Sequence, residues 1–322
     1  SLDNIVKNQK SFHVTLSEFE TYSDIYPTRN EGQNAWIAIM RGCNNYCTFC
    51  VVPHTRGRER SREPLNIVEE VKRLVSDGFK QVTLLGQNVN SYLYTDEHSD
   101  KEYDFADLIK MISDVDGIER IRFTSPHPKD FPRKLLTLMA ERDNICKQVH
   151  MPLQAGNNRI LDIMNRTYTK EEFLDLIDYT RKIIPNVTIT TDIIVGFSSE
   201  TDDEFQDTLD VVEKSQFDSA YMFKYSERPN TLASKRLPDD VPEDVKSTRL
   251  TQLIELQKKI STNKNEQHVG EIHEVLVDQL STKKDKNMFQ GRNDGNKIVT
   301  FPKGDYKLGD IINITIKKGT PH

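Results

Sequence analysis

The sequence contains no long apolar run and few cysteines, and each absence excludes a class of protein. No segment approaches the roughly 20 consecutive apolar residues that a membrane-spanning helix needs. The opening residues, SLDNIVKNQK, lack the basic start and apolar stretch of a secretory signal. Four cysteines in 322 residues are too few for the disulfide framework of a small secreted protein. We therefore expect a soluble, cytoplasmic protein with no membrane partner.

An excess of positive charge is also missing. The chain has 44 lysines and arginines against 50 aspartates and glutamates, so its formal net charge is -6. A protein that binds nucleic acid over its whole surface would be basic. Any contact with RNA must therefore come from a local basic patch.

Short apolar runs alternate with helical patterns through most of the chain. The expected strands are 36–40, 81–85, 118–123, 148–153, 188–195 and 219–223. The expected helices between them are 64–78, 105–112, 132–141, 170–184 and 202–214. Parallel strands need such crossover helices, so the alternation predicts an α/β fold with a parallel sheet. This spacing fits an open sheet and a partial barrel equally well.

A smaller unit follows a boundary segment rich in proline and acid, LPDDVPEDV. Leu250, Leu253, Ile254 and Ile260 predict an exposed amphipathic helix after this segment. Beyond the helix, short β-rich runs at 272–277, 297–301 and 311–316 are separated by turn signals. We expect a linker or edge segment at 1–33, a core with its connecting helix at 34–262, and a small barrel-like all-β domain at 263–322.

The strongest signal is a cluster of cysteines directly after the first expected strand. Cys43, Cys47 and Cys50 have the spacing C-x3-C-x2-C. Three thiolates on one tight loop can bind three irons of a 4Fe-4S cluster and leave the fourth iron open to a small molecule. A structural zinc site with His54 is the alternative, although zinc usually takes ligand pairs from two loops. Cys146 stands alone and is not expected to be a ligand.

This spacing resembles the signature of the radical S-adenosylmethionine (SAM) superfamily. The resemblance implies that the open iron binds SAM through its amino and carboxylate groups. Reduction then cleaves SAM to a 5′-deoxyadenosyl radical, while the protein binds and aims the cofactor. The resemblance also implies a partial (β/α)6 barrel, which agrees with the number of expected strands.

Longer motifs are similar to one branch of the superfamily, the methylthiotransferases that modify tRNA. These motifs are the run 39–62, LGQNVNSY at 85–92, MPLQ at 151–154, TDIIVGF at 191–197 and YMFKYS at 221–226. The C-terminal unit resembles the TRAM module, a small RNA-binding β-barrel, through GRNDGN at 291–296. The family reaction replaces the C2 hydrogen of an N6-isopentenyl adenosine, at position 37 of the tRNA anticodon loop, with a methylthio group.

The resemblance implies further components. Family members hold a second 4Fe-4S cluster in an N-terminal domain, and that cluster is implied to carry the inserted sulfur. We do not expect that domain in these residues, so we predict that this polypeptide alone cleaves SAM without completing sulfur insertion. The family also implies a sulfur source and a flavodoxin- or ferredoxin-type electron donor.

The candidate cofactor-binding residues are Tyr46, Phe49, Gln87, Asn88, Gln154 and Asp192. The first two lie inside the cysteine loop, where they either pack over adenine or shield the cluster from water. The other four end expected strands, and ligands bind at the carboxyl ends of parallel strands. The resemblance implies that the edge at 87–88 holds the methionine part of SAM. A turn-forming asparagine and a helix-capping aspartate are the structural alternatives.

The candidate RNA-binding residues are Arg56, Arg58, Arg60, Arg62, Lys283, Lys284 and Arg292. The first four alternate just beyond the cysteine loop, and arginine can grip phosphate with two hydrogen bonds. The other three lie in the unit that resembles TRAM, where contacts to the RNA backbone position the RNA. A solvated charged face is the structural alternative for both groups.

Two functional alternatives stay open. A sister methylthiotransferase acts on threonylcarbamoyl adenosine in tRNA or on a ribosomal protein aspartate, although RGRERSR at 56–62 resembles the isopentenyl-adenosine branch more closely. The second alternative, from a different class, is a non-catalytic RNA-binding protein with a structural metal. Zinc without sulfide would indicate the second alternative.

Overall fold

The main unit is a curved parallel sheet whose strands lie in their order along the chain. The computed structural model describes residues 33–280 and 285–321. The six strands are β1 (Asn34–Ala38), β4 (Gln81–Leu85), β7 (Arg120–Phe123), β8 (Gln148–His150), β9 (Thr188–Val195) and β10 (Ser219–Lys224). Neighbours pair in parallel, and a bridge from Ile121 to Ile145 joins the two halves. Within the described residues no ladder joins β1 to β10, so the expected partial (β/α)6 barrel is confirmed as an open one.

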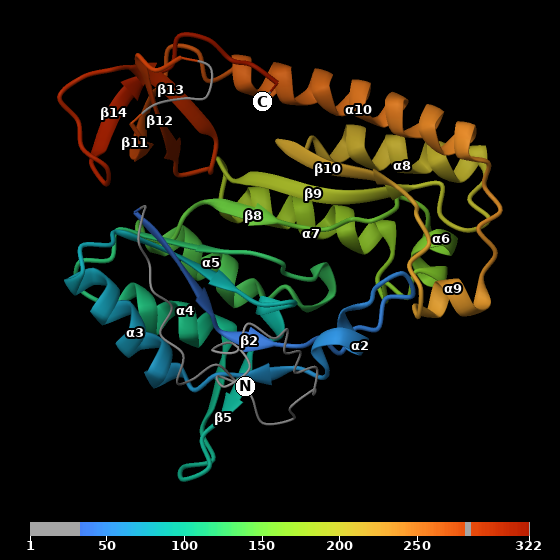
Figure 1. The fold of residues 1–322 in the computed structure, drawn as a ribbon, viewed down its shortest axis with the longest axis horizontal. Coiled ribbons are helices and arrows are strands. Elements are labelled where there is room, and N and C mark those ends of the chain that lie inside the picture. Colours follow the sequence, from blue (N-terminus) through green and yellow to red (C-terminus); the bar gives the residue numbers. More distant parts are fainter. Residues whose placement is uncertain (1–32, 281–284, 322) are drawn as a thin grey trace, which may run out of the picture.

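Five helices cover the outer face of this sheet (Figure 1). They are α3 (Pro64–Ser76), α4 (Phe105–Ser113), α5 (Arg133–Glu141), α7 (Lys170–Ile183) and α8 (Asp202–Ser215). Capping boxes begin three of them, because Asp104, Thr169 and Thr201 each accept a hydrogen bond from the third residue of the helix. Their apolar faces pack on the strands and form the main hydrophobic core.

The two faces of the barrel strands differ in polarity. In β9, Ile189, Ile193 and Val195 are buried under the helices, whereas Thr190 and Asp192 are only partly buried on the opposite face. Successive side chains on a strand point to opposite faces, so this alternation separates an apolar outer face from a polar inner one. The inner face is therefore available for a ligand.

Shorter elements close the carboxyl ends of the barrel strands. These are β2 (Met40–Arg41), α2 (Val52–Arg56), β3 (Arg60–Ser61), η1 (Val89–Ser91), η2 (Pro128–Asp130), α6 (Asn158–Ile163) and α9 (Leu232–Arg236). A small hairpin is formed by β5 (Leu93–Thr95) and β6 (Glu102–Asp104). None of the described helices combines the length and the apolar character that crossing a membrane requires.

The C-terminal unit is a curled antiparallel sheet, as expected for the barrel-like β domain. It is reached through α10 (Glu243–Glu266), and its strands are β11 (Ile272–Gln279), β12 (Met288–Asn293), β13 (Ile298–Pro302) and β14 (Ile311–Thr315). The strand order is β13-β12-β11-β14. Val275, Val277, Phe289, Val299 and Phe301 form its own small core. The division of the chain at residues 33 and 262 remains a prediction.

This sheet docks on the amino ends of the barrel strands, opposite the cysteine loop (Figure 1). The Arg120 guanidinium, at the start of β7, donates to the carbonyl oxygen of Arg292 at 2.6 Å. Arg122 donates to the carbonyl oxygens of Asn293 and Asp294 at 2.7 and 2.8 Å. Two buried arginines therefore hold the turn between β12 and β13 against the barrel.

Candidate active site

The cysteine loop begins in a conformation that only glycine tolerates well. Gly42 has φ of +83°, and a Cβ on it would lie 2.0 Å from the carbonyl oxygen of Arg58. Its N–H donates to Gln87 Oε1 at 2.6 Å, and the Cys43 N–H donates to the carbonyl oxygen of Gly57 at 3.2 Å. The start of the loop is thus held between the end of β4 and residues 57–58.

The second half of the loop is bound to residues far along the chain. The Thr48 N–H donates to the carbonyl oxygen of Met164 at 3.0 Å, and Thr48 Oγ1 donates to that of Ile163 at 2.8 Å. Asn165 Nδ2 donates to the carbonyl oxygens of Asn45 and Tyr46. These contacts fix the loop on the end of α6, so the three thiols are held by tertiary structure.

Burial disfavours the charged thiolate form of two of the three cysteines. Burial is the main cause that raises the pKa of Cys43 to about 11, and the charges of Glu59 and the other two thiols act in the same direction. Burial also raises the pKa of Cys50. The thiolate forms of Cys43 and Cys50 are therefore unfavourable unless a cationic group is bound beside them.

The number and placement of the thiols discriminate between the two metal centres. A structural zinc ion usually takes four protein ligands, commonly as pairs from two loops. Cys43, Cys47 and Cys50 are three ligands on one loop, and Cys146 is buried elsewhere, beside Arg122 and Asp294. Three cysteine thiolates can bind three irons of a 4Fe-4S cluster and leave the fourth iron open. The residues present therefore fit a 4Fe-4S cluster.

The two aromatic residues of the loop occupy different environments. Phe49 is partly buried against a second hydrophobic cluster, and its ring meets that of Phe197 edge-on at 6.3 Å. This cluster consists of Ala155, Ile160, Leu161, Met164, Phe197, Tyr225 and Ala233. Tyr46 is 41% exposed and has φ of +49°. Phe49 is placed to exclude water from one side of the loop, whereas the Tyr46 ring faces solvent.

Gln87 and Asn88 follow β4 directly beside the loop. Gln87 Oε1 already accepts from the Gly42 N–H, so this side chain supports the loop. Asn88 is buried, and its Nδ2 donates to Asp130 Oδ2 at 3.3 Å. Among the described residues, Asn88 Oδ1 has no hydrogen-bond partner. A buried acceptor without a partner is costly, so Asn88 Oδ1 is the side-chain oxygen of this pair that is open to a further hydrogen-bond donor among the described residues.

Gln154 and Asp192 lie next to each other at the carboxyl ends of β8 and β9. The Gln154 N–H donates to the carbonyl oxygen of Asp192 at 2.8 Å, and Gln154 has φ of +68°. Asp192 Oδ2 lies 3.2 Å from His150 Nε2, and His150 Nδ1 lies 2.9 Å from Thr190 Oγ1. The inner face therefore carries a connected polar group that sequence reasoning missed at His150.

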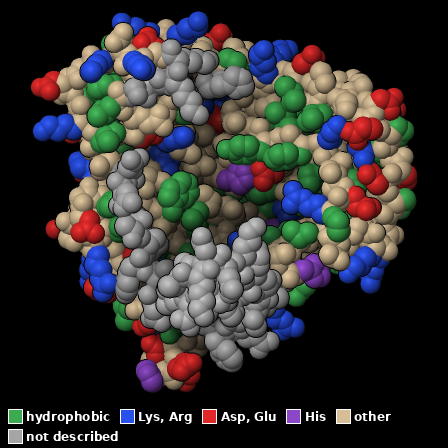
Figure 2. All heavy atoms as spheres, viewed as in Figure 1, with side chains coloured by type: hydrophobic (Ala, Val, Ile, Leu, Met, Phe, Trp, Pro, Cys, Tyr) green, Lys and Arg blue, Asp and Glu red, His purple; other side chains and the backbone are tan. Residues whose placement is uncertain are grey.

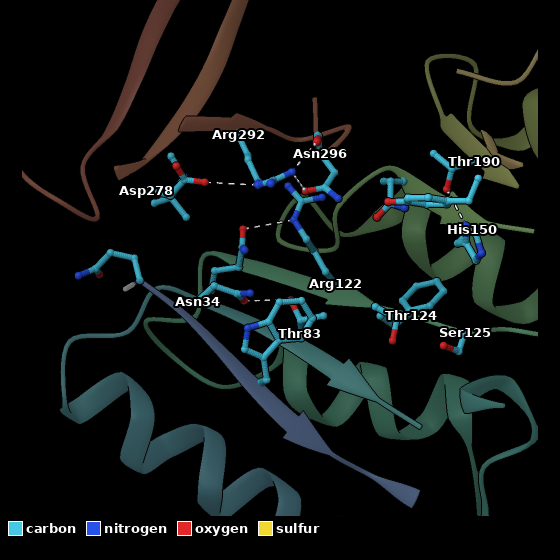
Figure 3. Close-up of a pocket in the computed structure, with 17 residues that line it drawn as sticks. Asn34, Thr83, Arg122, Thr124, Ser125, His150, Thr190, Asp278, Arg292 and Asn296 are labelled. Atoms are coloured by element: carbon cyan, nitrogen blue, oxygen red, sulfur yellow. Dashed lines mark hydrogen bonds and ion pairs between the residues drawn. The ribbon is translucent and has the colours of Figure 1, made fainter. Parts of the chain in front are cut away.

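A cavity of about 480 Å³ occupies the inside of the barrel, and the C-terminal sheet closes it at the amino ends of the strands (Figure 3). Its lining includes Asn34, Trp36, Thr83, Arg122, Thr124, Ser125, His150, Thr190, Tyr221, Asp278, Arg292 and Asn296. In Figure 2, which has the same viewpoint as Figure 1, the surface is hollowed near its centre, with hydrophobic side chains on both sides of the hollow. The polar positions that alternate along the barrel strands were the available sequence signal for this cavity.

The predicted RNA-binding residues do not share one environment. Arg56 and Arg58 are exposed beside the cysteine loop, and Arg60 is partly buried. Arg62 is buried, and its Nη1 donates to Glu70 Oε2 at 3.0 Å and to the carbonyl oxygen of Ala38 at 2.6 Å. The structure therefore places Arg62 in the protein interior, apart from any surface that the other three share.

The C-terminal candidates are also divided. Lys283 and Lys284 lie outside the described residues. The Arg292 guanidinium lies 3.3 Å from Asp278 Oδ2, and both side chains line the cavity (Figure 3). Arg292 therefore lines the cavity from the C-terminal sheet, and 37% of its side chain remains exposed.

Two family profiles and several solved structures match this arrangement. Residues 37–212 match the Radical SAM superfamily, and residues 266–322 match the TRAM domain. Coproporphyrinogen III oxidase from Escherichia coli, a radical SAM enzyme, aligns with a TM-score of 0.52 at 14% identity, over 93% of this chain and 79% of its own. A radical SAM methyltransferase from Kitasatospora setae aligns with a TM-score of 0.51 at 16% identity, over 76% and 42%. Fold and cysteine loop thus define a radical SAM protein with a TRAM domain, which confirms the predicted 4Fe-4S cluster and SAM as cofactors.

Sequence relatives specify the family further. A tRNA-2-methylthio-N(6)-dimethylallyladenosine synthase from Bacteroides thetaiotaomicron is 45% identical over 314 residues, which are 97% of this chain and 69% of the relative. The protein of that name from Chloroherpeton thalassium is 46% identical over 319 residues, or 99% and 70%. The chain belongs to the family of tRNA-2-methylthio-N(6)-dimethylallyladenosine synthases.

Proposed function

We propose that this chain carries the radical chemistry and part of the tRNA binding of a methylthiotransferase that acts at C2 of N6-isopentenyl adenosine in tRNA. The observation that carries the proposal is one barrel with a three-cysteine loop at the carboxyl ends of its strands and a polar cavity inside it. The cavity volume falls within the range of about 300–1,000 Å³ that is usual for small-ligand sites. The relatives named above support the same substrate.

In this proposal the cysteine loop binds and aims the cofactors. Cys43, Cys47 and Cys50 hold the cluster, and the cluster with SAM supplies the radical. Gln87 fixes the loop through the Gly42 N–H, and Asn88 Oδ1 accepts a hydrogen bond from SAM. Water is excluded on one side by Phe49 packed against Phe197.

The target nucleoside enters the cavity as a base that leaves the RNA stack. Single-stranded RNA is commonly read by stacking on aromatic rings and by hydrogen bonds to base edges. Trp36 and Tyr221 line the cavity from the two edge strands, and both remain more than half exposed. His150 and Thr190 also line the cavity, and His150 contacts both Thr190 and Asp192 on the inner face. The aromatic pair supplies stacking surface, and the polar group supplies base contacts.

The exposed arginines beside the loop contact the tRNA backbone in this proposal. Arg56 and Arg58 are the exposed pair next to the site. The double change to alanine is expected to weaken tRNA binding and to make the affinity less sensitive to salt, by about one unit of the log–log slope for each phosphate that the variant no longer neutralises. Lys72→Ala on α3 is the matched control, because Lys72 is exposed and paired with Glu69. An unchanged salt slope in the double variant would refute these contacts.

Three further components complete the reaction. The sulfur is supplied from outside these residues, by a second cluster and its sulfur source. Electrons come from a flavodoxin- or ferredoxin-type donor. Each component is tested by adding it to the reconstituted chain and measuring methylthiolated RNA by mass spectrometry.

The first experiment tests the radical chemistry. The chain is reconstituted anaerobically with iron and sulfide, and SAM and a strong reductant are added. The parent is expected to form 5′-deoxyadenosine, and Cys47→Ala is expected to form none. A fully loaded parent that forms none would refute the proposed role of the open iron.

A second experiment tests the substrate. Anticodon stem-loops that carry unmodified, isopentenylated or threonylcarbamoylated adenosine are compared for binding and for hydrogen transfer to 5′-deoxyadenosine. Preference for the isopentenylated RNA is expected. Preference for the threonylcarbamoylated RNA would identify the sister enzyme. Zinc without sulfide in the purified chain would instead favour the non-catalytic alternative.

A further inference from the structure

Arg166 is a buried arginine that lies behind the cysteine loop. It follows the end of α6 by three residues, and only 4% of its surface is exposed. Its Nη1 donates to Cys47 Sγ at 3.3 Å. The guanidinium thus contacts the sulfur of a cluster ligand from the protein interior.

The other groups that accept hydrogen bonds from Arg166 are uncharged. Nη2 donates to the carbonyl oxygen of Pro152 at 2.9 Å, and Nε donates to the Tyr168 hydroxyl at 3.1 Å. In the part of the chain that the structure describes, no carboxylate forms an ion pair with this guanidinium. Two comparably buried arginines differ in this respect, because Arg62 pairs with Glu70 and Arg249 pairs with Glu200.

A buried cation without a counter-ion is unfavourable, because burial removes its hydration. Nearby residues do not supply the missing negative charge. Burial first, and then the positive charge of Arg166, lower the pKa of His127 to about 3, so His127 is neutral. The Tyr168 hydroxyl keeps its proton, because it donates hydrogen bonds to the carbonyl oxygens of Pro152 and Leu153. The negative partner that remains is the thiolate of Cys47 when it binds iron.

We propose that Arg166 is the buried counter-ion of the cluster, and that its charge and its hydrogen bond to Cys47 Sγ make the cluster easier to reduce. Three thiolates on a 4Fe-4S core of charge 2+ give a net charge of −1, and one electron from an external reductant makes it −2. In this step the protein neither gains nor loses a proton, and no covalent bond of the protein forms or breaks. A fixed positive charge and a hydrogen bond to the sulfur stabilise the more negative state, so the reduction potential rises.

Arg166 is a positioning residue in this proposal, because it acts through the sulfur of Cys47. Two substitutions separate its charge from its geometry. Arg166→Gln removes the charge and retains a hydrogen-bond donor. Arg166→Lys retains the charge and loses the planar fork. Arg159→Gln is the matched control, because Arg159 is half exposed on α6 and is already paired with Glu204.

The test is a redox titration of each reconstituted protein, followed by the electron paramagnetic resonance signal of the reduced cluster, without SAM or tRNA. Arg166→Gln is expected to reduce the equilibrium constant for one-electron reduction at least tenfold, which lowers the midpoint potential by about 59 mV or more. Arg166→Lys is expected to keep most of the parent potential, and Arg159→Gln all of it. An unchanged midpoint potential in Arg166→Gln would overturn the proposal.

Loss of the cluster is also informative, because iron and sulfide content are measured for every variant. If Arg166→Gln fails to load a cluster and Arg166→Lys loads one with the parent potential, the positive charge is required and the proposal is supported. If neither variant loads a cluster while both retain the parent circular dichroism, the guanidinium fork has a structural role and the proposal is overturned. The titration contains no RNA, so a wrong assignment of the tRNA substrate would leave its result unchanged.

Discussion

Asp218 joins three separate parts of the molecule, so its removal should weaken the connection between the barrel and the C-terminal sheet. The carboxylate is buried at the entrance to β10. Its Oδ1 lies 2.8 Å from Lys297 Nζ, and its Oδ2 lies 3.0 Å from Lys264 Nζ in α10. Oδ2 also accepts a hydrogen bond from the Ile189 N–H in β9 at 2.9 Å. One carboxylate thus contacts the barrel, the connecting helix and the turn before β13.

Asp218→Asn is expected to destabilise the folded protein by about 3 kcal/mol. Breaking a buried ion pair from one side costs about 3–5 kcal/mol, and the lower end applies because water reaches about a fifth of each lysine. With an unfolding entropy of about 2.1 cal/mol/K per residue over 322 residues, 1 kcal/mol shifts the melting temperature by about 1.5 °C. The expected decrease in melting temperature is therefore about 4 °C.

The assay is thermal unfolding followed by circular dichroism at one fixed scan rate, with Asp202→Asn as the control. Asp202 is 94% exposed and bonds one arginine, so its change should cost less than about 1 kcal/mol. Equal melting temperatures for Asp218→Asn and Asp202→Asn would refute the assignment of Asp218 as a buried connection.

The pH dependence of the same difference has a defined sign. Burial alone would raise the pKa of Asp218, but the charges of Lys297 and Lys264 outweigh it and hold the pKa below its ordinary value. A lowered folded-state pKa gives stability that is present above the unfolded pKa of about 3.9 and is lost as pH falls through the folded pKa. The gap between the parent and Asp218→Asn should be full at neutral pH and shrink only below about pH 3.9. A gap that shrinks between pH 7 and 5 would contradict this assignment.

Three further predictions concern the cysteine loop, the buried Arg62 and the remaining cysteine, Cys146. Gly42→Ala should lower the iron bound per chain, because its Cβ would lie 2.0 Å from the Arg58 carbonyl oxygen; the parent iron content in this variant would contradict that. Arg62→Met should destabilise the fold by about 3–5 kcal/mol because it breaks a buried ion pair, whereas the exposed Arg58→Met should melt like the parent; equal melting of the two variants would place Arg62 on the surface. Cys146→Ala should leave iron and sulfide content unchanged. In the parent, Cys146 should resist iodoacetamide, because the thiol is buried and this burial raises its pKa to about 11, so little reactive thiolate forms. Rapid alkylation of native Cys146 would show that the thiol is accessible.

The connecting helix α10 shows a limit of periodicity. Leu253 and Ile260 are buried as a helical pattern predicts, and Ile254 is 42% exposed. The same face also buries the polar side chains of Arg249 and Gln257, which an apolar pattern does not reveal. The helix packs on β10 and α8 with this face, so the expected amphipathic helix is confirmed, and its buried face is more polar than the apolar pattern predicts. Polar side chains can be buried there because their partners, such as Glu200 and the Phe217 carbonyl oxygen, come from the barrel.

Strand β12 was missed for a related reason. Its sequence, MFQGRN, has a glycine at its centre and few β-branched residues, so local propensity does not favour a strand. The structure places Gly291 so close to β11 that a Cβ would lie 2.3 Å from the carbonyl oxygen of Leu276. Pairing with neighbours on both sides makes this segment a strand, and glycine permits the close approach.

The sequence by itself determined the alternation of strands and helices, the parallel sheet and the three-cysteine loop. These features depend on local periodicity and short spacing, as in β4 and β9, whose observed bounds match the expected ones. Tertiary structure alone decided which charged side chains are buried and what they contact. Arg166 meets Cys47 across 119 residues, and Arg120 meets Arg292 across 172. Such partners lie far apart in the chain, so no local pattern indicates them, and only folding of the whole chain brings them together.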